Sequence, residues 1–379
     1  MKVVFMVSSL VAGGAERQTI ELFLGLPALG IQTRLCFLKD QHQLLPSIPS
    51  ERQGDVWCPG FQARWDGAGL WRLVKRLKAE APDLVVAVNS YPLFYSHLAR
   101  LLCGRQWPVE VVYHSTDLPP LEWRQFRWVY KHFFNRSHKI FYVCHAQRQH
   151  WELRGLRSSL GVVIHNGVDP ALFDADTQIV AASAVSGQLK LEGAELVVGI
   201  CAALRPEKRH GDLLEALALL RAKGLDVCAL VIGDGPQRAV IEHDIQRLRL
   251  AGRVQLVGFQ QDVRPYMVAC DCLVIVSHSE TFSLAVLEGM ALGKPMVVSD
   301  IGGAREQIVD GVHGHVVHEG DVAGLAAALQ SLMDPAGRRR MGVAARQRVG
   351  VEFTRDQMLR RYADEFLARV SSPARAAGL

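Results

Sequence analysis

Short apolar runs alternate with amphipathic segments along almost the whole chain, and this alternation limits its fold more than any other feature. In the first part, helical patterns such as Glu16–Leu26 and Leu70–Glu80 separate apolar runs of strand length. The strand-like runs there are Val3–Val7, Thr33–Leu38, Leu84–Val88, Val109–His114 and Ile140–Val143. This pattern predicts parallel βα units, and therefore an open sheet with helices on both faces.

The pattern stops once and then restarts. Asp174–Glu195 is rich in Ala, Ser and Gly and has no clear period, whereas a second βα series begins at Leu196. Its expected strands are Leu196–Cys201, Val227–Ile232, Val254–Val257, Cys272–Val276 and Pro295–Ser299, and its expected helices are His210–Lys223, Pro236–Leu250 and Leu284–Leu292. The predicted domains are a Rossmann-like domain over 1–175, a linker over 176–195, a second such domain over 196–353, and over 354–379 a helix that returns to the first domain, with a tail.

The composition fits two ordinary globular cores, because 49% of the 379 residues are hydrophobic and 21% are charged. A formal net charge of +5 suits an anionic ligand or membrane surface but is too small to argue for nucleic acid. The eight cysteines form no CxxC pair, which favours a reducing compartment over a zinc site. No apolar run approaches the roughly 18 residues of a membrane-spanning helix. We expect a cytoplasmic protein, either soluble or peripheral on the inner face of the cell membrane.

The stretch Ser277–Asp300 contains the candidate site. It reads as a strand, a polar loop, a helix, a glycine turn and a second strand. If Ser283 caps the helix, the backbone N–H groups of Phe282, Ser283 and Leu284 point outward at the carboxyl end of a strand. Free N–H groups and the positive end of the helix dipole favour a phosphate there, and open α/β sheets bind ligands at this edge.

Two carboxylates flank this position, Glu280 in the loop and Glu288 inside the helix. Carboxylates accept hydrogen bonds from sugar hydroxyls, and a vicinal diol can bridge both oxygens. Glu280 therefore suits a transferred sugar and Glu288 a ribose. The alternative is that both are solvated surface residues. The otherwise apolar segment Leu284–Leu292 argues against this for Glu288, because a buried carboxylate needs a partner.

The spacing Glu280-x7-Glu288, followed by Gly293-Lys294-Pro295, resembles the E-x7-E signature of the fourth glycosyltransferase family, which has the GT-B fold. Six further pieces match in the expected order over nearly the whole chain. They are Gly13–Glu16, His165–Asp169, Leu204–Lys208, Gly233–Pro236, Val257–Phe259 and Gly302–Glu306. The resemblance implies two Rossmann-like domains with a cleft between them. It also implies retaining transfer of a sugar from a nucleotide diphosphate to an acceptor hydroxyl, in cell-envelope polysaccharide or glycolipid synthesis.

In this resemblance, Lys208 matches the family lysine that binds the donor diphosphate. Ala203 stands where the family usually has an arginine, so Arg205, or otherwise Arg209, is the candidate substitute. A cation is needed because the leaving group gains negative charge. His114 resembles the family histidine that faces the donor sugar, although a lone histidine after a strand is also often structural. Together with Glu280, the residues Lys208 and His114 are the catalytic candidates.

Further matched positions are expected to bind the donor or the acceptor. Gly14 lets the backbone approach a phosphate or the acceptor closely, with a simple turn as the alternative. Gly258 and Phe259 resemble the position where the backbone meets the nucleobase, with a core phenylalanine as the alternative. Asn89, after strand Leu84–Val88, is expected to face the acceptor. The family's E-G-F-G is Glu-Thr-Phe-Ser from Glu280 onward, so both glycines are replaced.

The expected partners are a nucleotide-sugar donor and a glycan or lipid-linked acceptor, with no bound metal, no other cofactor and no nucleic acid. The basic and aromatic segment Trp123–Lys139 suits an anionic membrane, or alternatively forms a helix with a solvated basic face. Competing functions are a non-catalytic nucleotide-sugar binder, a GT-B epimerase and an NAD-dependent oxidoreductase. The last is disfavoured because the GxGxxG fingerprint is absent. The nucleobase, sugar, acceptor, linkage and oligomeric state stay open.

Overall fold

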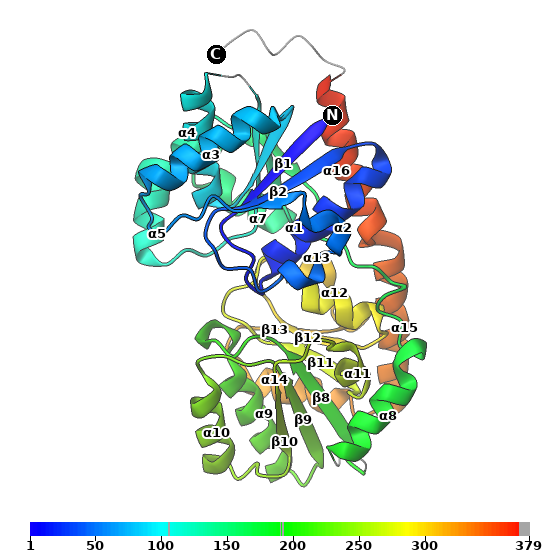
Figure 1. Ribbon diagram of the computed structural model, residues 1–379. Coiled ribbons are helices and arrows are strands. Elements are labelled where there is room, and N and C mark those ends of the chain that lie inside the picture. The colour runs from blue at the N-terminus through cyan, green and yellow to red at the C-terminus, as the bar shows by residue number, and fades with distance from the viewer. Residues whose placement is uncertain (105–106, 190, 192, 371–379) are drawn as a thin grey trace. The chain divides into compact units, whose positions relative to one another are not determined.

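The computed structural model describes residues 1–104, 107–189, 191 and 193–370, so the predicted tail Ser371–Leu379 lies outside the described residues. The chain forms two compact units. The N-terminal unit holds Met1–Asn166 and the described residues from Arg355 onward, and the C-terminal unit holds Gly167–Thr354. Each unit has its own parallel sheet covered by helices (Figure 1), which confirms the predicted α/β fold class.

The N-terminal sheet has seven parallel strands in the order β3-β2-β1-β4-β5-β6-β7. The strands are β1 (Lys2–Val7), β2 (Gln32–Phe37), β3 (Val56–Trp57), β4 (Leu84–Val88), β5 (Val109–Tyr113), β6 (Ile140–Tyr142) and β7 (Gly161–Val163). Val3 of β1 lies opposite Thr33 of β2 on one side and Leu84 of β4 on the other. The direction of strand order therefore reverses between β1 and β4, the kind of switch point at which doubly wound sheets bind ligands.

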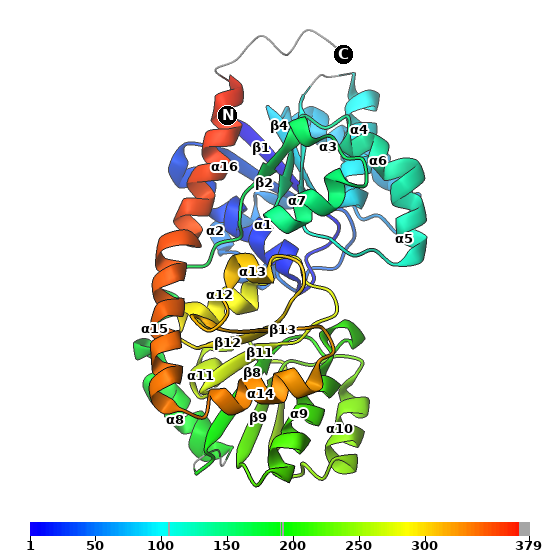
Figure 2. The same ribbon diagram turned by 180° about the vertical axis from the view of Figure 1, so that it is seen from behind.

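Helices cover both faces of this sheet. They are α1 (Gly14–Gly25), α2 (Ser50–Gln53), α3 (Gly67–Glu80), α4 (Ser90–Cys103), α5 (Pro120–Gln125), a π-helical turn (Phe126–Tyr130), α6 (Lys131–Phe134), α7 (His145–Glu152) and α16 (Arg355–Val370). The helix α16, red in Figures 1 and 2, shares a core with α1, where Tyr362 and Phe366 pack with Phe23 of α1 and Phe5 of β1. The last described helix of the chain thus completes the N-terminal unit.

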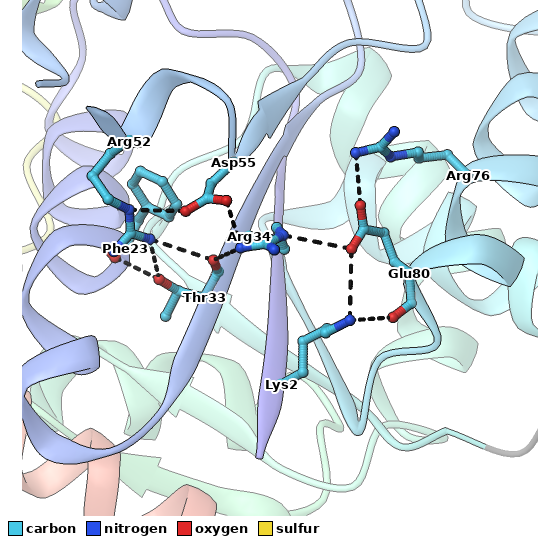
Figure 3. Close-up of polar contacts among 8 residues, drawn as sticks. All are labelled: Lys2, Phe23, Thr33, Arg34, Arg52, Asp55, Arg76 and Glu80. Atoms are coloured by element: carbon cyan, nitrogen blue, oxygen red, sulfur yellow. Dashed lines mark hydrogen bonds and ion pairs between the residues drawn. The ribbon is translucent and has the colours of Figure 1, made fainter. Parts of the chain in front are cut away.

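An ion-pair network ties together the amino-terminal ends of the first strands (Figure 3). Glu80, at the end of α3, lies 2.7 Å from Arg76, 3.5 Å from Arg34 and 3.8 Å from Lys2. Arg34 also lies 2.6 Å from Asp55. Because this edge is opposite to the carboxyl ends of the strands, we assign the network to stability.

The C-terminal sheet has six parallel strands in the order β10-β9-β8-β11-β12-β13. The strands are β8 (Leu196–Cys201), β9 (Val227–Ile232), β10 (Val254–Gly258), β11 (Cys272–Ile275), β12 (Met296–Ser299) and β13 (Gly314–Val317). The order reverses between β8 and β11, which pair directly through Cys272 and Val198. The candidate site stretch follows β11, so it stands at the switch point of this sheet.

Helices also cover both faces of the C-terminal sheet. They are α8 (Ile179–Gln188), α9 (His210–Ala222), α10 (Arg238–Arg247), α11 (Arg264–Val268), α12 (Leu284–Ala291), α13 (Ala304–Gln307), α14 (Val322–Ser331) and α15 (Pro335–Glu352). The helices α9, α10 and α14 share one core with the sheet, while α12 packs with α15 and α11 with α8. No described helix is both long and apolar enough to cross a bilayer.

The boundary between the units falls at residue 166, earlier than the boundary expected at 175. The stretch expected to be a linker, 176–195, contains the helix α8 and belongs to the C-terminal unit. Val168 N donates to Phe353 O at 3.0 Å, and Arg264 donates to Leu172 O at 3.1 Å. These bonds hold the connecting segment on the C-terminal unit. The sequence did not indicate α8 because its Ala, Ser and Gly residues give little hydrophobic period.

Candidate functional site

Two loops meet at the switch point of the C-terminal sheet. Lys208 follows β8 in the short 3-10 turn Pro206–Lys208, and Glu280 follows β11. The Lys208 ammonium forms an ion pair with the Glu280 carboxylate, and about a fifth of each side chain is exposed. His278 N also donates to Glu207 O at 2.8 Å, which joins the backbones of the two loops. Two of the predicted site residues, 72 positions apart in sequence, are therefore in contact.

A glycine turn after β12 packs against the Glu280 loop. Gly302 has φ +52°, and a Cβ atom there would lie 2.1 Å from Glu280 O and 2.8 Å from Thr281 O. Gly303 N donates to Thr281 O at 2.8 Å. Gly302 thus lets a second loop pack directly against the carbonyls of the Glu280 loop, which no residue with a Cβ atom could do at this position.

Ser283 precedes α12 in an extended conformation but makes no side-chain cap. Its N–H donates instead to Gln307 Oε1 at 3.3 Å, and Gln307 Nε2 donates to Ser283 O at 2.8 Å. The Ser283 N–H, predicted to point at an anion, is therefore engaged by a buried glutamine. Leu284 is the first residue of α12, Phe282 is buried, and the N–H groups of a first helical turn have no acceptor within their helix.

Glu288 lies inside α12 and only 2% of its surface is exposed. This burial rules out the alternative in which Glu288 is a solvated surface residue. A carboxylate buried to this degree is costly to place without hydrogen-bond or ionic partners, so its position is specific. The ribose contact expected from the family resemblance stays a prediction.

The two arginines beside Lys208 differ in how far their guanidinium groups are engaged by carboxylates. Arg209 has φ +47° and forms a two-point pair with Asp212, with N–O distances of 2.6 and 3.2 Å. The hydrogen bond to Asp212 raises the pKa of Arg209. Arg205 is exposed, and its guanidinium lies 4.0 Å from the Glu207 carboxylate. The Arg205 backbone O accepts from Lys208 N at 3.0 Å. Among the described residues, however, the Arg205 guanidinium contacts neither the Lys208 ammonium nor the Glu280 carboxylate, so the structure does not bring this predicted substitute into the ion pair.

The backbone of the Gly233–Pro236 motif packs directly against the loop that follows β8. Gly233 has φ +140°, and a Cβ there would lie 2.1 Å from Ala202 O. A Cβ on Gly235 would lie 2.6 Å from Leu204 O. Leu204 N donates to Asp234 O at 3.1 Å. The motif is therefore a close backbone packing that shapes the loop leading to Lys208.

The strand β10 ends in Gly258, which has φ +72° and accepts a hydrogen bond from Gly233 N at 2.9 Å. The next residue, Phe259, is 70% exposed. The alternative of a plain core phenylalanine is therefore wrong. A ring this exposed at the carboxyl end of a parallel strand is available to stack on a planar ligand group.

In the N-terminal unit, His114 directly follows β5. Burial lowers the pKa of His114 to about 4, so its ring is neutral at pH 7. Its backbone N donates to Asn89 Oδ1 at 2.9 Å. Gly14 is the exposed first residue of α1, after the N-cap Gly13. Neither glycine has positive φ, so their conformation is one that other residues also adopt.

The segment Trp123–Lys139 contains the end of α5, the π-helical turn, α6 and the residues that connect α6 to β6. Its rings point mostly inward, because Phe126, Tyr130 and Phe134 are buried. The exposed apolar side chains are Trp128, at 74% exposure, and Val129, with Leu121 just before the segment. The outer face therefore mixes a few apolar residues with arginines, while most of the aromatic content belongs to the core.

Comparison with known proteins identifies the class. The family described as glycosyl transferases group 1 matches residues 184–348, and glycosyltransferase family 4 matches residues 12–172. The alpha-D-kanosaminyltransferase of Streptomyces kanamyceticus is 35% identical over 316 residues, which cover 78% of this chain and 79% of that protein. The chain belongs to the group 1 glycosyltransferase family.

Two further similarities qualify this result. The N-acetyl-alpha-D-glucosaminyl L-malate synthase of Bacillus anthracis is 33% identical over 159 residues, 42% of each chain. The chain thus spans less than half the length of the curated relatives that it matches first. A crystal structure of Anabaena HepE with UDP-glucose is 25% identical, with a TM-score of 0.82 over 97% of this chain and 100% of that chain. This likeness confirms the predicted GT-B fold.

Proposed function

We propose that the protein is a retaining glycosyltransferase that moves a sugar from a nucleotide diphosphate to an acceptor hydroxyl. The observation that carries this proposal is the Lys208–Glu280 ion pair at the switch point of the C-terminal sheet. A lysine there stabilises the charge that develops on the departing diphosphate, and Glu280 accepts hydrogen bonds from sugar hydroxyls. The UDP-glucose bound to the similar Anabaena protein supports a nucleotide-sugar donor.

In the proposed reaction, the acceptor oxygen attacks the anomeric carbon from the face that the diphosphate leaves. The bond from this carbon to the phosphate oxygen breaks as the glycosidic bond forms, so the anomeric configuration is retained. The donor phosphate takes the acceptor proton, and no side chain acts as a nucleophile. Lys208 and Glu280 supply charge and orientation, and their ion pair keeps both groups in position before the donor binds.

The remaining candidates take roles at the same donor. We propose that neutral His114 contacts the donor sugar, that Glu288 binds the ribose and that Phe259 stacks on the nucleobase. The low pKa of His114 supports a hydrogen-bonding role in which the ring carries no charge. The exposure of the Phe259 ring supports stacking. On the same family resemblance, we propose that the backbones of Gly14 and Gly258 line the donor site.

We also propose that the reaction needs no bound metal, because the Lys208 ammonium supplies the positive charge that a metal ion would otherwise supply to the departing diphosphate. Transfer should then persist in excess EDTA. A loss of activity in EDTA that Mg²⁺ or Mn²⁺ restores would contradict this part of the proposal.

The acceptor we propose is a glycan or lipid-linked molecule of cell-envelope synthesis, reached by a protein resting on the membrane. Leu121, Trp128 and Val129 offer exposed apolar area, with Arg124 and Arg127 beside them to meet anionic headgroups. Sedimentation with phosphatidylglycerol vesicles tests this. Trp128→Ala should release the protein from the vesicles, whereas Trp71→Ala, which changes a tryptophan of α3 that is also well exposed, should not.

The second candidate is a non-catalytic nucleotide-sugar binder. It is favoured by Ala203, which removes the usual arginine, and by Arg205, which pairs only with Glu207 among the described residues. A donor that binds but is never consumed with any acceptor would support this alternative.

Nucleotide release across common sugar donors, with a pool of acceptors, decides between the two. We expect Lys208→Met and Glu280→Gln each to lower release by about a hundredfold or more, the range for losing one charge-stabilising group. Lys223→Met and Glu215→Gln, which change an exposed lysine directly after α9 and an exposed glutamate within it, should behave like the parent protein. Equal release from all four variants would overturn the proposal.

A further inference from the structure

A cavity of about 470 Å³ opens at the carboxyl edge of the N-terminal sheet. Ser8 follows β1 and Asn89 follows β4, and both line the cavity, which places it at the switch point of this sheet. Lys39, after β2, and Ser115, after β5, complete the strand-end part of the lining. The donor residues of the C-terminal unit do not contribute to it.

Two cations line this cavity without an acidic partner. Lys39 and Arg64 form no ion pair with any carboxylate among the described residues. Lys39 Nζ lies 5.3 Å from the centre of the Tyr91 ring, and Arg64 donates to the Tyr130 hydroxyl at 2.7 Å. Arg34 and Arg209, by contrast, each pair with a carboxylate. Two unneutralised cations facing one cavity favour an anionic occupant.

The loop that carries Arg64 is held by hydrogen bonds that involve two tyrosine hydroxyls and one carboxylate. The Tyr95 hydroxyl donates to Arg64 O at 2.5 Å, and the Tyr91 hydroxyl donates to the same oxygen at 3.3 Å. Asp66 accepts from Gln62 N at 2.9 Å. The backbone around Arg64 is therefore fixed before any ligand binds, which lowers the entropy cost of binding.

Asn89 adds strain at the same place. It has φ +66° and ψ −176°, a conformation that is almost restricted to glycine. Its backbone N donates to Val112 O at 2.9 Å, and its Oδ1 accepts from His114 N at 2.9 Å. These bonds hold the strained residue between β4 and β5. Conformations of this kind cluster at ligand sites because a particular side-chain position is required there.

The charge distribution of the chain agrees with an anionic ligand in this unit. Residues 1–166 contain 20 Lys and Arg against 12 Asp and Glu, whereas residues 167–354 contain 18 against 23. The modest net charge of the whole chain hides this difference. A positive surrounding field raises the local concentration of anions and speeds their association.

We infer that this cavity holds the acceptor, and that the acceptor is a hydroxylated molecule with a phosphate or carboxylate group bound by Lys39 and Arg64. This inference rests on the proposed function and deepens it. Ser8, Asn89 and Ser115 offer hydrogen bonds to the hydroxyl-bearing part, and Glu122, the acid that lines the cavity, accepts from hydroxyls.

The test measures binding of glucose 6-phosphate and of glucose to the full-length protein saturated with UDP, which keeps the probe out of the donor site. Glucose 6-phosphate should bind at least tenfold more tightly than glucose, and its affinity should fall as salt rises. Lys39→Met and Arg64→Gln should each lose at least tenfold of that affinity. Lys75→Met, which removes an exposed lysine of α3 outside the cavity, should lose none. Tyr130→Phe, which removes the hydrogen bond from Arg64 to the Tyr130 hydroxyl and leaves its bond to Gln125, should lose less than Arg64→Gln.

A second arm separates a soluble from a lipid-borne anion. Vesicles of phosphatidylcholine with phosphatidylinositol replace glucose 6-phosphate, and vesicles of phosphatidylcholine alone replace glucose. Lys39-dependent and Arg64-dependent binding in either arm supports the inference. Equal affinity of the variants and the parent protein in both arms would overturn it.

The two proposals fail in different ways. Donor turnover that depends on Lys208, combined with anion binding that ignores Lys39 and Arg64, would leave the proposed function standing and remove the anionic acceptor site. Anion binding that depends on Lys39 and Arg64, combined with no turnover of any donor, would keep the cavity as an anion site and remove the transferase.

Discussion

Gln307 holds Ser283 at both ends of its backbone, donating to Ser283 O at 2.8 Å and accepting from Ser283 N at 3.3 Å. Gln307 lies at the end of α13, and Ser283 lies directly before α12. A buried side chain from the end of α13 therefore fixes where the helix beside Glu280 begins. Gln307 is a positioning residue of the candidate site.

Replacing Gln307 with alanine should loosen the start of α12 and lower donor turnover. We expect kcat/KM to fall about tenfold and stability to fall by about 1–2 kcal/mol, because two hydrogen bonds of a buried amide are lost. Gln307→Glu should not restore activity, since a carboxylate oxygen would face Ser283 O. The exposed Gln330, which contacts Lys223, provides the control: Gln330→Ala should match the parent protein in both measurements.

Gly302 and Gly311 give a matched pair for the Glu280 loop. Both have positive φ, but a Cβ on Gly302 would strike Glu280 O at 2.1 Å, whereas a Cβ on Gly311 would meet nothing within 4 Å. Gly311→Ala should cost about 1 kcal/mol of stability through its φ angle and leave donor affinity unchanged. Gly302→Ala should add a loss of donor affinity of at least tenfold, measured by titration with a nucleotide sugar. Equal donor affinity in the two variants would show that the loop does not depend on this packing.

The alternation of apolar and amphipathic segments was sufficient to predict the two sheets, because runs such as Leu196–Cys201 and Val227–Ile232 have the length and β-branched content of buried strands. The short strands β3 and β7, with two and three residues, carry too little periodicity to be detected. The helix α8 was missed because its small residues give no apolar face.

The sequence predicted only those site residues that belong to a recognisable motif. The positions of Lys208 and Glu280 follow from motif spacing and from the rule that ligands bind at the switch point of a sheet. The role of Gln307 does not, because it depends on the end of α13 lying next to the start of α12 in space. Likewise, no local sequence pattern indicates that Arg64, which has no carboxylate partner among the described residues, lines a cavity. The solvent exposure of single side chains could not be predicted either. The local sequence does not distinguish Phe259 from Phe126, although only Phe259 is exposed.

Glu80 joins three cations at the amino-terminal edge of the N-terminal sheet (Figure 3). Glu80→Ala leaves Lys2 and Arg76 without their carboxylate, so we expect a stability loss of about 1–3 kcal/mol, seen as a lower denaturant midpoint. Because the network lies at the opposite edge from the candidate sites, donor turnover per folded molecule should not change. Glu51→Ala, which removes an exposed acid of α2, should leave both quantities near the parent values. A turnover loss in Glu80→Ala without unfolding would contradict the assignment to stability.

Buried histidines should make the protein sensitive to mild acid. Burial lowers the pKa of His210, at the start of α9, to about 4, and both ring nitrogens lack a hydrogen-bond partner among the described residues. In the unfolded chain the same ring has a pKa of about 6.5. The unfolded state therefore binds more protons between these values, so the stability contribution is complete above pH 6.5 and is lost as the pH falls towards 4. For a shift of this size the loss reaches about 3 kcal/mol.

His210→Leu should remove this pH dependence, because leucine fills the buried site and does not titrate. The difference in unfolding free energy between pH 7 and pH 4.5 should shrink by about 2–3 kcal/mol relative to the parent protein, measured by denaturant unfolding at both pH values. His97 and His114, whose pKa values burial lowers to about 3 and about 4, leave part of the acid sensitivity in place. His243→Leu, at an exposed position of α10, should keep the parental difference, and an unchanged difference in His210→Leu would mean that the ring is solvated in the folded protein.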